Sequence, residues 1–216
     1  MNTNNKDIKP FYIYTDKNCL YMKNINEHTE KLSNNIHTYS ANIDNNQKIH
    51  VCGIDTSGKL IHFYNNNGYW KKKVICKTFS SIKNIKNMRL YIINNLFNVF
   101  IVEDYPLSEN LYRVTHFNFN LSNYKISKYH INNILKDNSS FYKLSVDDLS
   151  NIIFEYKSTS STRDFKNNTL IFNTTSRSWL NPTTLLRGGS PLYDNPSPSD
   201  IKSDIFEYCY SITYKS

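Results

Sequence analysis

The chain has 216 residues, a mass of 25.4 kDa and a formal net charge of +8 at pH 7. Its length suits one domain or two small ones, and its 39% hydrophobic and 14% aromatic content is too high for a disordered protein. No apolar run approaches the roughly 20 residues of a membrane-spanning helix. The polar residues 1–9 lack the apolar segment of a secretory signal, so we expect a cytoplasmic protein.

The composition favours strands over helices. Ala41 is the only alanine, whereas asparagine, β-branched and aromatic residues are abundant, so helix propensity is low. The first expected element is a hairpin, in which residues 11–14 and 19–22 flank the polar turn 15–18.

A three-stranded meander is expected next, over residues 48–54, 59–64 and 69–75. Its connections contain Ser57-Gly58 and Asn67-Gly68, and glycine and asparagine tolerate the positive φ angles of tight hairpin turns. Similar series of strands and turns follow, with strands expected at residues 88–94, 97–104, 111–119, 126–131, 141–146, 151–157, 169–173, 179–180 and 204–213.

Two segments depart from this series. In residues 82–95, the apolar positions Ile82, Ile85 and Met88 have the spacing of a helical turn that leads to a strand. Residues 187–202 contain two of the five glycines and three of the six prolines, which is typical of a long loop.

The strand series repeats along the chain. One apolar residue of each series can be aligned, and the spacings are roughly 40–55 residues, which is the period of a β-propeller; the aligned residues are Tyr12, Val51, Phe100, Phe154 and Phe206. We therefore expect an all-β fold, a single β-propeller domain over residues 1–216 with about four or five four-stranded antiparallel blades. The approximate repeat units are 10–36, 37–75, 88–131, 140–186 and 187–216, of which the first and last are incomplete.

The innermost strands and the chain termini decide whether such a ring closes. Residues 99–102 and 152–154 are apolar throughout, so we expect them in innermost strands with both faces covered. Residues 11–14 align with the second strand of later units, which leaves the first unit without an innermost strand. In one alternative, residues 204–213 pair beside residues 11–14 and close a four-bladed ring; in the other, they begin a fifth blade that further sequence or another copy completes. We favour contact between the termini, because unpaired strands would leave exposed edges.

One unit resembles the blades of a known family. Residues 48–75 read Ile-His-Val, then Asp-Thr-Ser-Gly-Lys-Leu-Ile-His-Phe-Tyr, then Gly-Tyr-Trp and a basic strand. This resembles a blade of the tachylectin-like and sialidase-like β-propellers, in which an Asp/Gly turn precedes the third strand and a Trp opens the outer strand. Ser178-Trp179 stands at the matching place of a later unit. The WD40 propellers are excluded, since the chain has no Trp-Asp or Gly-His pair.

The sequence contains no catalytic motif. A sialidase-like enzyme would have turns ending in Thr-Trp, an arginine cluster and a Tyr/Glu nucleophile pair, and residues 55–58 lack that ending, so we interpret them as a hairpin turn. The acidic pairs Glu103-Asp104 and Asp147-Asp148 are neighbours in expected strands or turns. Adjacent strand residues point to opposite faces, so such a pair cannot flank one glycosidic bond.

No metal or cofactor site is expected. His50 and His62 lie on neighbouring strands and can meet in space, but no third ligand stands beside them. The four cysteines have no CxxC spacing and are expected to be free thiols; they are Cys19, Cys52, Cys76 and Cys209.

Basic and aromatic residues have alternative interpretations. The run Lys71 to Lys73 is the densest basic stretch, and we expect a solvated strand there, with nucleic-acid binding unlikely. Trp70 and Trp179 can stack on a sugar or pack between blades, and packing is favoured because they occupy equivalent places.

The function predicted from these patterns is that of a non-enzymatic, lectin-like β-propeller binding module. Its ligand is a glycan or a protein partner, and the sequence assigns no ligand-binding residues. The alternatives are a sialidase-like, glycoside-processing enzyme on the same fold and a structural part of a larger assembly.

Overall fold

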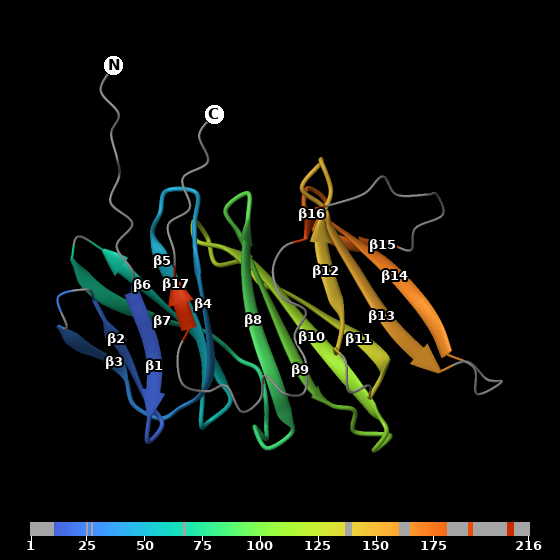
Figure 1. The fold of residues 1–216 in the computed structure, drawn as a ribbon, viewed down its shortest axis with the longest axis horizontal. Coiled ribbons are helices and arrows are strands. Elements are labelled where there is room, and N and C mark those ends of the chain that lie inside the picture. Colours follow the sequence, from blue (N-terminus) through green and yellow to red (C-terminus); the bar gives the residue numbers. More distant parts are fainter. Residues whose placement is uncertain are drawn as a thin grey trace. The chain divides into compact units, whose positions relative to one another are not determined.

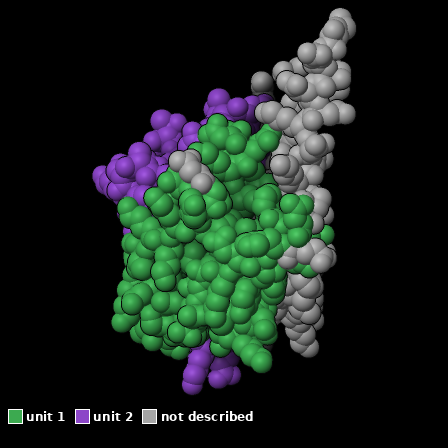
Figure 2. Space-filling model, turned by 90° about the vertical axis from the view of Figure 1, so that its left-hand side faces the viewer, with its two compact units in different colours: residues 1–82, 203–216 green, residues 83–202 purple. Residues whose placement is uncertain are grey.

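The computed structural model describes residues 11–24, 26, 28–66, 68–136, 140–159, 165–180, 190–191 and 207–209. The regular structure of these residues is entirely β, in four antiparallel sheets (Figure 1). No helix that is long and apolar enough to span a membrane occurs among them. The chain divides into two compact units, residues 1–82 with 203–216 and residues 83–202 (Figure 2).

The first unit contains two four-stranded sheets, here called sheet A and sheet B. Sheet A has the order β17-β1-β2-β3 and sheet B the order β4-β5-β6-β7. The strands of sheet A are β1 (Phe11–Asp16), β2 (Cys19–Lys23), β3 (Thr29–Ser33) and β17 (Glu207–Cys209). Those of sheet B are β4 (Ile36–Ile43), β5 (Ile49–Asp55), β6 (Lys59–Asn66) and β7 (Tyr69–Lys77).

The second unit contains sheet C and sheet D. Sheet C consists of β8 (Ile85–Ile93), β9 (Leu96–Asp104), β10 (Leu111–Asn120) and β11 (Ser127–Leu135) in sequential order. Sheet D consists of β12 (Lys143–Val146), β13 (Ile152–Thr159), β14 (Phe165–Asn173) and β15 (Ser178–Leu180), with the short β16 (Ser190–Pro191) on the other side of β12.

Tight turns join the strands at the predicted places. Lys17 and Asn18 have φ angles of 46° and 64°, and Gly58 has a φ of 80°, so the chain reverses within a few residues. A side chain cannot be accommodated at Gly58, because a Cβ atom there would lie 2.1 Å from the backbone carbonyl oxygen of Phe79. Residues 82–84 form a bend and a turn, not a turn of helix, and β8 begins at Ile85.

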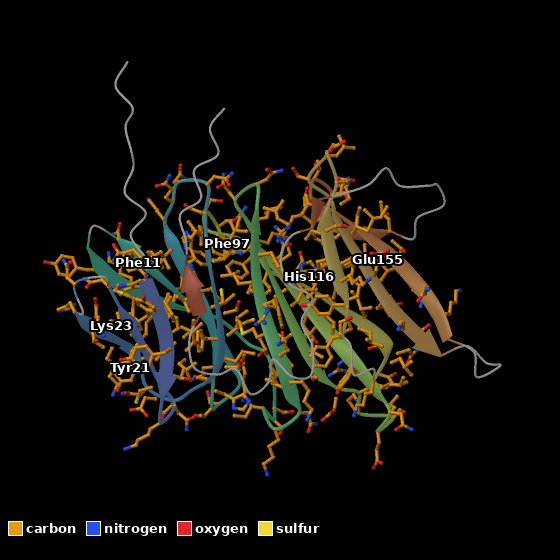
Figure 3. The ribbon with its side chains drawn as sticks, in the orientation of Figure 1. Phe11, Tyr21, Lys23, Phe97, His116 and Glu155 are labelled. Carbon is orange, nitrogen blue, oxygen red and sulfur yellow. The ribbon has the colours of Figure 1, made fainter. Side chains whose placement is uncertain are left out.

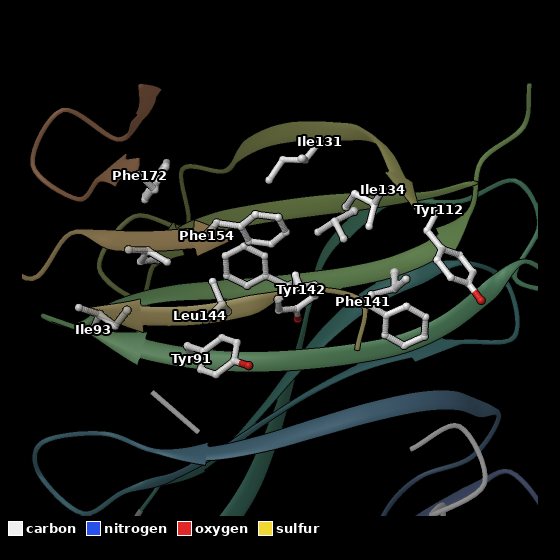
Figure 4. Close-up of a cluster of buried hydrophobic side chains, with 14 residues drawn as sticks. Tyr91, Ile93, Tyr112, Ile131, Ile134, Phe141, Tyr142, Leu144, Phe154 and Phe172 are labelled. Carbon is white, nitrogen blue, oxygen red and sulfur yellow. The ribbon is translucent and has the colours of Figure 1, made fainter. Parts of the chain in front are cut away.

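Each unit buries its core between its two sheets. In the first unit, Ile13 and Leu20 of sheet A pack with Val51 and Phe63 of sheet B. In the second, alternate residues of sheets C and D meet in a larger and more aromatic cluster that includes Phe100, Phe154 and Phe172 (Figure 4). The predicted period of two therefore places alternate residues of strands such as β5 and β13 in a core.

The predicted repeat matches the strand order in each sheet. Tyr12, Val51, Phe100 and Phe154 lie on β1, β5, β9 and β13, which are the second strands of their sheets. The expectation that residues 99–102 and 152–154 form innermost strands is wrong, since β9 and β13 have a strand on each side. These runs are apolar because interior strands are covered on both faces and both edges.

The strand pairing expected in the first closure alternative is observed. β17 pairs antiparallel with β1, with Tyr12 opposite Tyr208, and it supplies the strand that sheet A lacks. β16 pairs with β12 of sheet D. The described strands of the last sequence repeat, residues 187–216, therefore join sheets A and D instead of starting a fifth sheet. Phe206, the residue aligned in that repeat, lies outside the described residues.

Candidate functional site

A cavity of about 280 Å³ lies at one end of sheet D. Its walls come from three neighbouring segments of the second unit. The lining residues are Ser140, Phe141, Tyr142, Lys143, Glu155, Tyr156, Lys157, Asn167, Asn168 and Thr169.

The late start of β12 positions these segments. Lys143, the first residue of β12, pairs with Glu155, and β13 continues for four more residues that pair only with β14. Before β12, the side chains of Phe141 and Tyr142 turn into the core: the Phe141 ring meets that of Tyr112 edge-on at 4.8 Å, and the Tyr142 ring stacks on Phe154 at 4.7 Å. The segment 140–143 is thereby fixed by two buried aromatic side chains.

The strand register divides the lining side chains between two faces. Lys143, Glu155 and Thr169 are directly opposite one another on β12, β13 and β14, so their side chains share a face. Lys157 and Asn167 form the next row on that face. Tyr156 and Asn168 are paired on the opposite face, which is the face of the core. Figure 3 shows the place of Glu155 on β13.

Several of the lining polar side chains are available to a ligand. Those of Lys143, Glu155, Asn167 and Thr169 form no hydrogen bond or ion pair with the part of the chain that the structure describes. Asn168 is held from within, because its Nδ2 donates to Ser158 Oγ at 2.7 Å and to the carbonyl oxygen of Lys166 at 3.1 Å. Its Oδ1 is left as an acceptor.

Tyr156 adds an aromatic surface with a phenol group. Its side chain is half-buried against the core, and its ring lies 5.7 Å from that of Phe154. Burial raises the pKa of Tyr156 above its usual value, so the phenol remains protonated at neutral pH.

A second polar cluster in this unit centres on His116, and its members hydrogen-bond one another. Trp179 Nε1 donates to His116 Nδ1 at 3.2 Å, so the imidazole is neutral and its Nε2 donates to Asn98 Oδ1 at 3.1 Å. Asn118 Nδ2 donates to the same oxygen at 2.8 Å, and Arg177 Nε donates to Asn118 Oδ1 at 2.5 Å. These hydrogen bonds join sheets C and D, and the groups that form them are engaged with one another.

The predicted meeting of His50 and His62 is confirmed in the first unit. His50 Nδ1 lies 3.0 Å from His62 Nε2, and His50 Nε2 lies 3.3 Å from Asp44 Oδ2. Burial lowers the pKa of His62 to about 3 and also lowers that of His50, with a smaller opposing effect from Asp44. Within the described ranges, no group of three histidine, cysteine, aspartate or glutamate side chains is arranged to hold a metal ion.

The other residues singled out by sequence have structural roles. Asp55 stabilises the predicted hairpin turn, since its Oδ1 accepts hydrogen bonds from the backbone N–H groups of Ser57 and Lys59. Glu103 is buried and accepts from Arg113 Nε at 2.9 Å, whereas Asp104, at the end of β9, is paired with Lys86 and Lys136.

The second acidic pair belongs to a turn. Asp147 accepts backbone N–H groups from Leu149 and Asn151 between β12 and β13. Asp148 is its neighbour in this connection, and neither residue lines the cavity.

The tryptophans, lysines and cysteines also take the favoured interpretation. Trp70 and Trp179 each occupy the second position of the fourth strand of a sheet and pack against its core. The lysines of the basic run lie on β7, an exposed edge strand. Cys19, Cys52 and Cys76 are free thiols, and no side-chain description extends to Cys209.

Sequence reasoning missed the residues of the cavity. They form no motif, and they are brought together by the point at which β12 begins. The only signal in the sequence was that polar residues interrupt otherwise apolar strands at Lys143, Glu155 and Thr169.

Comparison with known proteins gives only distant similarity of structure. No protein-family model matches the chain, and no curated protein matches its sequence. The α-L-arabinofuranosidase of Podospora anserina in complex with cellotriose is 8% identical, with a TM-score of 0.39 over 84% of this chain and 70% of that one. The catalytic domain of the GH62 α-L-arabinofuranosidase of Coprinopsis cinerea is 10% identical, with a TM-score of 0.38 over the same shares.

A third structure is the complex of the fission yeast SREBP–SCAP binding domains. It is 12% identical, with a TM-score of 0.43 over 98% of this chain and 63% of that one. Likeness at this level carries no conclusion about activity, so the function is argued from the residues of the chain itself.

Proposed function

We propose that this chain is a non-enzymatic, β-propeller-type binding module that holds a glycan in the cavity of sheet D. Four antiparallel sheets of successive strands support a propeller, as does the completion of sheet A by a strand from the other end of the chain. The tachylectin-like and sialidase-like resemblance of residues 48–75 remains part of this proposal.

The observation that carries the glycan proposal is the set of unpartnered hydrogen-bonding groups around one small cavity. A sugar presents several hydroxyl groups that both donate and accept, so its site needs donors and acceptors of both kinds. On one face of the sheet, Glu155 supplies an acceptor, Lys143 supplies a donor, and Asn167 supplies both. The ring of Tyr156 and Asn168 Oδ1 line the cavity from the other face, where β13 extends beyond the start of β12.

The dimensions of the cavity favour a small ligand over a protein surface. Its volume of about 280 Å³ is near the lower limit of roughly 300–1,000 Å³ for small-molecule pockets. A stable protein interface instead buries roughly 800 Å² on each partner, mostly on broad surfaces. A glycan terminus of one or two rings therefore fits this site better than a folded partner.

The chemistry of the cavity also favours binding over hydrolysis. Glycosidases generally place two carboxyl groups on either side of the bond that they cleave. Among the described residues that line the cavity, Glu155 is the single carboxylate. A binding role uses that carboxylate as an acceptor for sugar hydroxyls.

A glycan array followed by titration of the best sugar tests this proposal. We expect binding without turnover, and Glu155→Ala should weaken it at least tenfold, about 1.5 kcal/mol, because a charged hydrogen-bond acceptor is removed. Glu109→Ala is the matched control, since Glu109 is an exposed glutamate of the same unit outside the cavity. An array without any bound sugar, or equal effects of the two variants, would overturn the glycan proposal.

A further inference from the structure

The charged groups of the cavity wall define a preference among sugars. Lys143 and Lys157 lie on the same face as Glu155, one directly opposite it and the other two residues along β13. All three side chains are exposed, and the two ammonium groups outnumber the one carboxylate. Among the described residues of the wall, positive side chains therefore outnumber negative ones by one.

Lys143 is the more informative of the two lysines. It has no ion pair with any described residue, even though Glu155 is its cross-strand partner. An ammonium group that is not engaged by its neighbour can pair with a charge on the ligand at no cost of breaking an existing bond. Glu155 then serves the hydroxyl groups of the same ring.

From this arrangement we propose that the cavity selects sugars that carry a negative charge, and that Lys143 is the residue that binds the charged group. The inference rests on the proposed glycan binding and adds the class of glycan. The charged group of the ligand can be a carboxylate or a sulfate. Arginine would favour planar carboxylates through its two-pronged geometry, but the described lining residues include no arginine, and a lysine ammonium acts as a point charge.

Three methyl glycosides that differ only at carbon 6 provide the probes: the neutral glucoside, the 6-carboxylate and the 6-sulfate. Titration by NMR or calorimetry should show both anions binding roughly five- to tenfold tighter than the neutral sugar at low salt, as for one charge-assisted hydrogen bond. The preference should decrease as salt is added, because exposed charges are screened. A marked difference between the two anions would refute the point-charge role of Lys143.

Two variants change the preference in opposite directions. Lys143→Gln should bring the anions to the affinity of the neutral sugar, and Lys83→Gln is the matched control, an exposed lysine of the same unit outside the cavity. Glu155→Gln should strengthen binding of the anions, because the carboxylate repels them, while weakening binding of the neutral sugar. A merely structural effect of either substitution would move all three ligands together.

The outcomes distinguish failure of the charge preference from failure of the proposed glycan binding. If the neutral sugar binds as tightly as both anions, the charge preference is refuted and glycan binding stands. If none of the probes or array sugars binds, the proposed function itself fails. If the Lys143→Gln variant still prefers the anionic sugars, Lys143 is not the residue that binds their charged group.

Discussion

Acidification should destabilise the second unit through a single buried histidine. His116 is fully buried, its ring is stacked 4.3 Å from that of Phe100, and both of its nitrogens are hydrogen-bonded. Burial, with a smaller contribution from the Arg177 guanidinium, lowers the pKa of His116 to about 3 from an ordinary value of 6.5. Protonation would also abolish the hydrogen bond from Trp179, because Nδ1 would become a donor.

The sign and size of the effect follow from the two pKa values. The folded chain keeps His116 neutral, whereas the unfolded chain takes up a proton below pH 6.5, so stability is complete above that pH and decreases toward pH 3. Between pH 7 and pH 5 the free energy of unfolding should fall by about 2 kcal/mol from this residue alone. His62 should add a loss of similar size in the first unit.

Urea unfolding of the native chain and of His116→Gln at both pH values measures this contribution. The amide of glutamine does not titrate, so the variant should lose about 2 kcal/mol less than the native chain on acidification, whatever its stability at pH 7. NMR titration of the imidazole gives a second readout. An imidazole that titrates near 6.5, or equal losses in the two proteins, would refute the neutral, buried assignment.

Four further outcomes are expected. Trp179→Phe should destabilise the chain by about 1–3 kcal/mol more than Trp70→Phe in urea unfolding, because the first leaves a buried acceptor unpaired, whereas the second removes a buried indole N–H that has no hydrogen-bond partner among the described residues; equal losses would refute this. Deleting residues 205–216 should lower the free energy of unfolding by about 2 kcal/mol or more, because β1 loses its hydrogen-bonded pairing with β17. The loss should be seen as a lower melting temperature and increased aggregation, and an unchanged melting temperature would contradict it. Replacing Lys71 and Lys73 with serine should leave stability nearly unchanged but increase aggregation measured by light scattering, since edge lysines prevent strand pairing. Duplex DNA should bind both the native and the serine-substituted chain weakly, with binding lost at physiological salt.

How much could be predicted from the sequence depended on how local each feature is. The contact between His50 and His62 was predictable, because one tight turn fixes the register: His50 pairs with Tyr64 and Cys52 with His62, which makes the histidines diagonal neighbours on one face. β3 and β4 were missed, because charged and polar residues dominate β3 and the polar residues between Ile36 and Ile43 conceal the alternation of β4.

Features that need several strands were beyond such reasoning. The partners of His116 come from β9 and from the fourth strand of another sheet, so its role requires both the pairing and the packing of the sheets. The cavity likewise depends on where β12 starts, and short strand boundaries are the least certain part of a sequence-based prediction.

The pairing of β17 with β1 has a consequence for the order of folding. Phe11 is opposite Cys209, so this ladder joins residues separated by nearly the whole chain. At synthesis rates of roughly 5–20 residues per second, sheet A must wait on the order of 10–40 s after Phe11 is made before its last strand exists. Residues 83–202 can finish pairing their own strands during that interval. Until then the edge of β1 stays open, which makes the nascent chain vulnerable to misassociation late in translation and gives the closing step a high contact order.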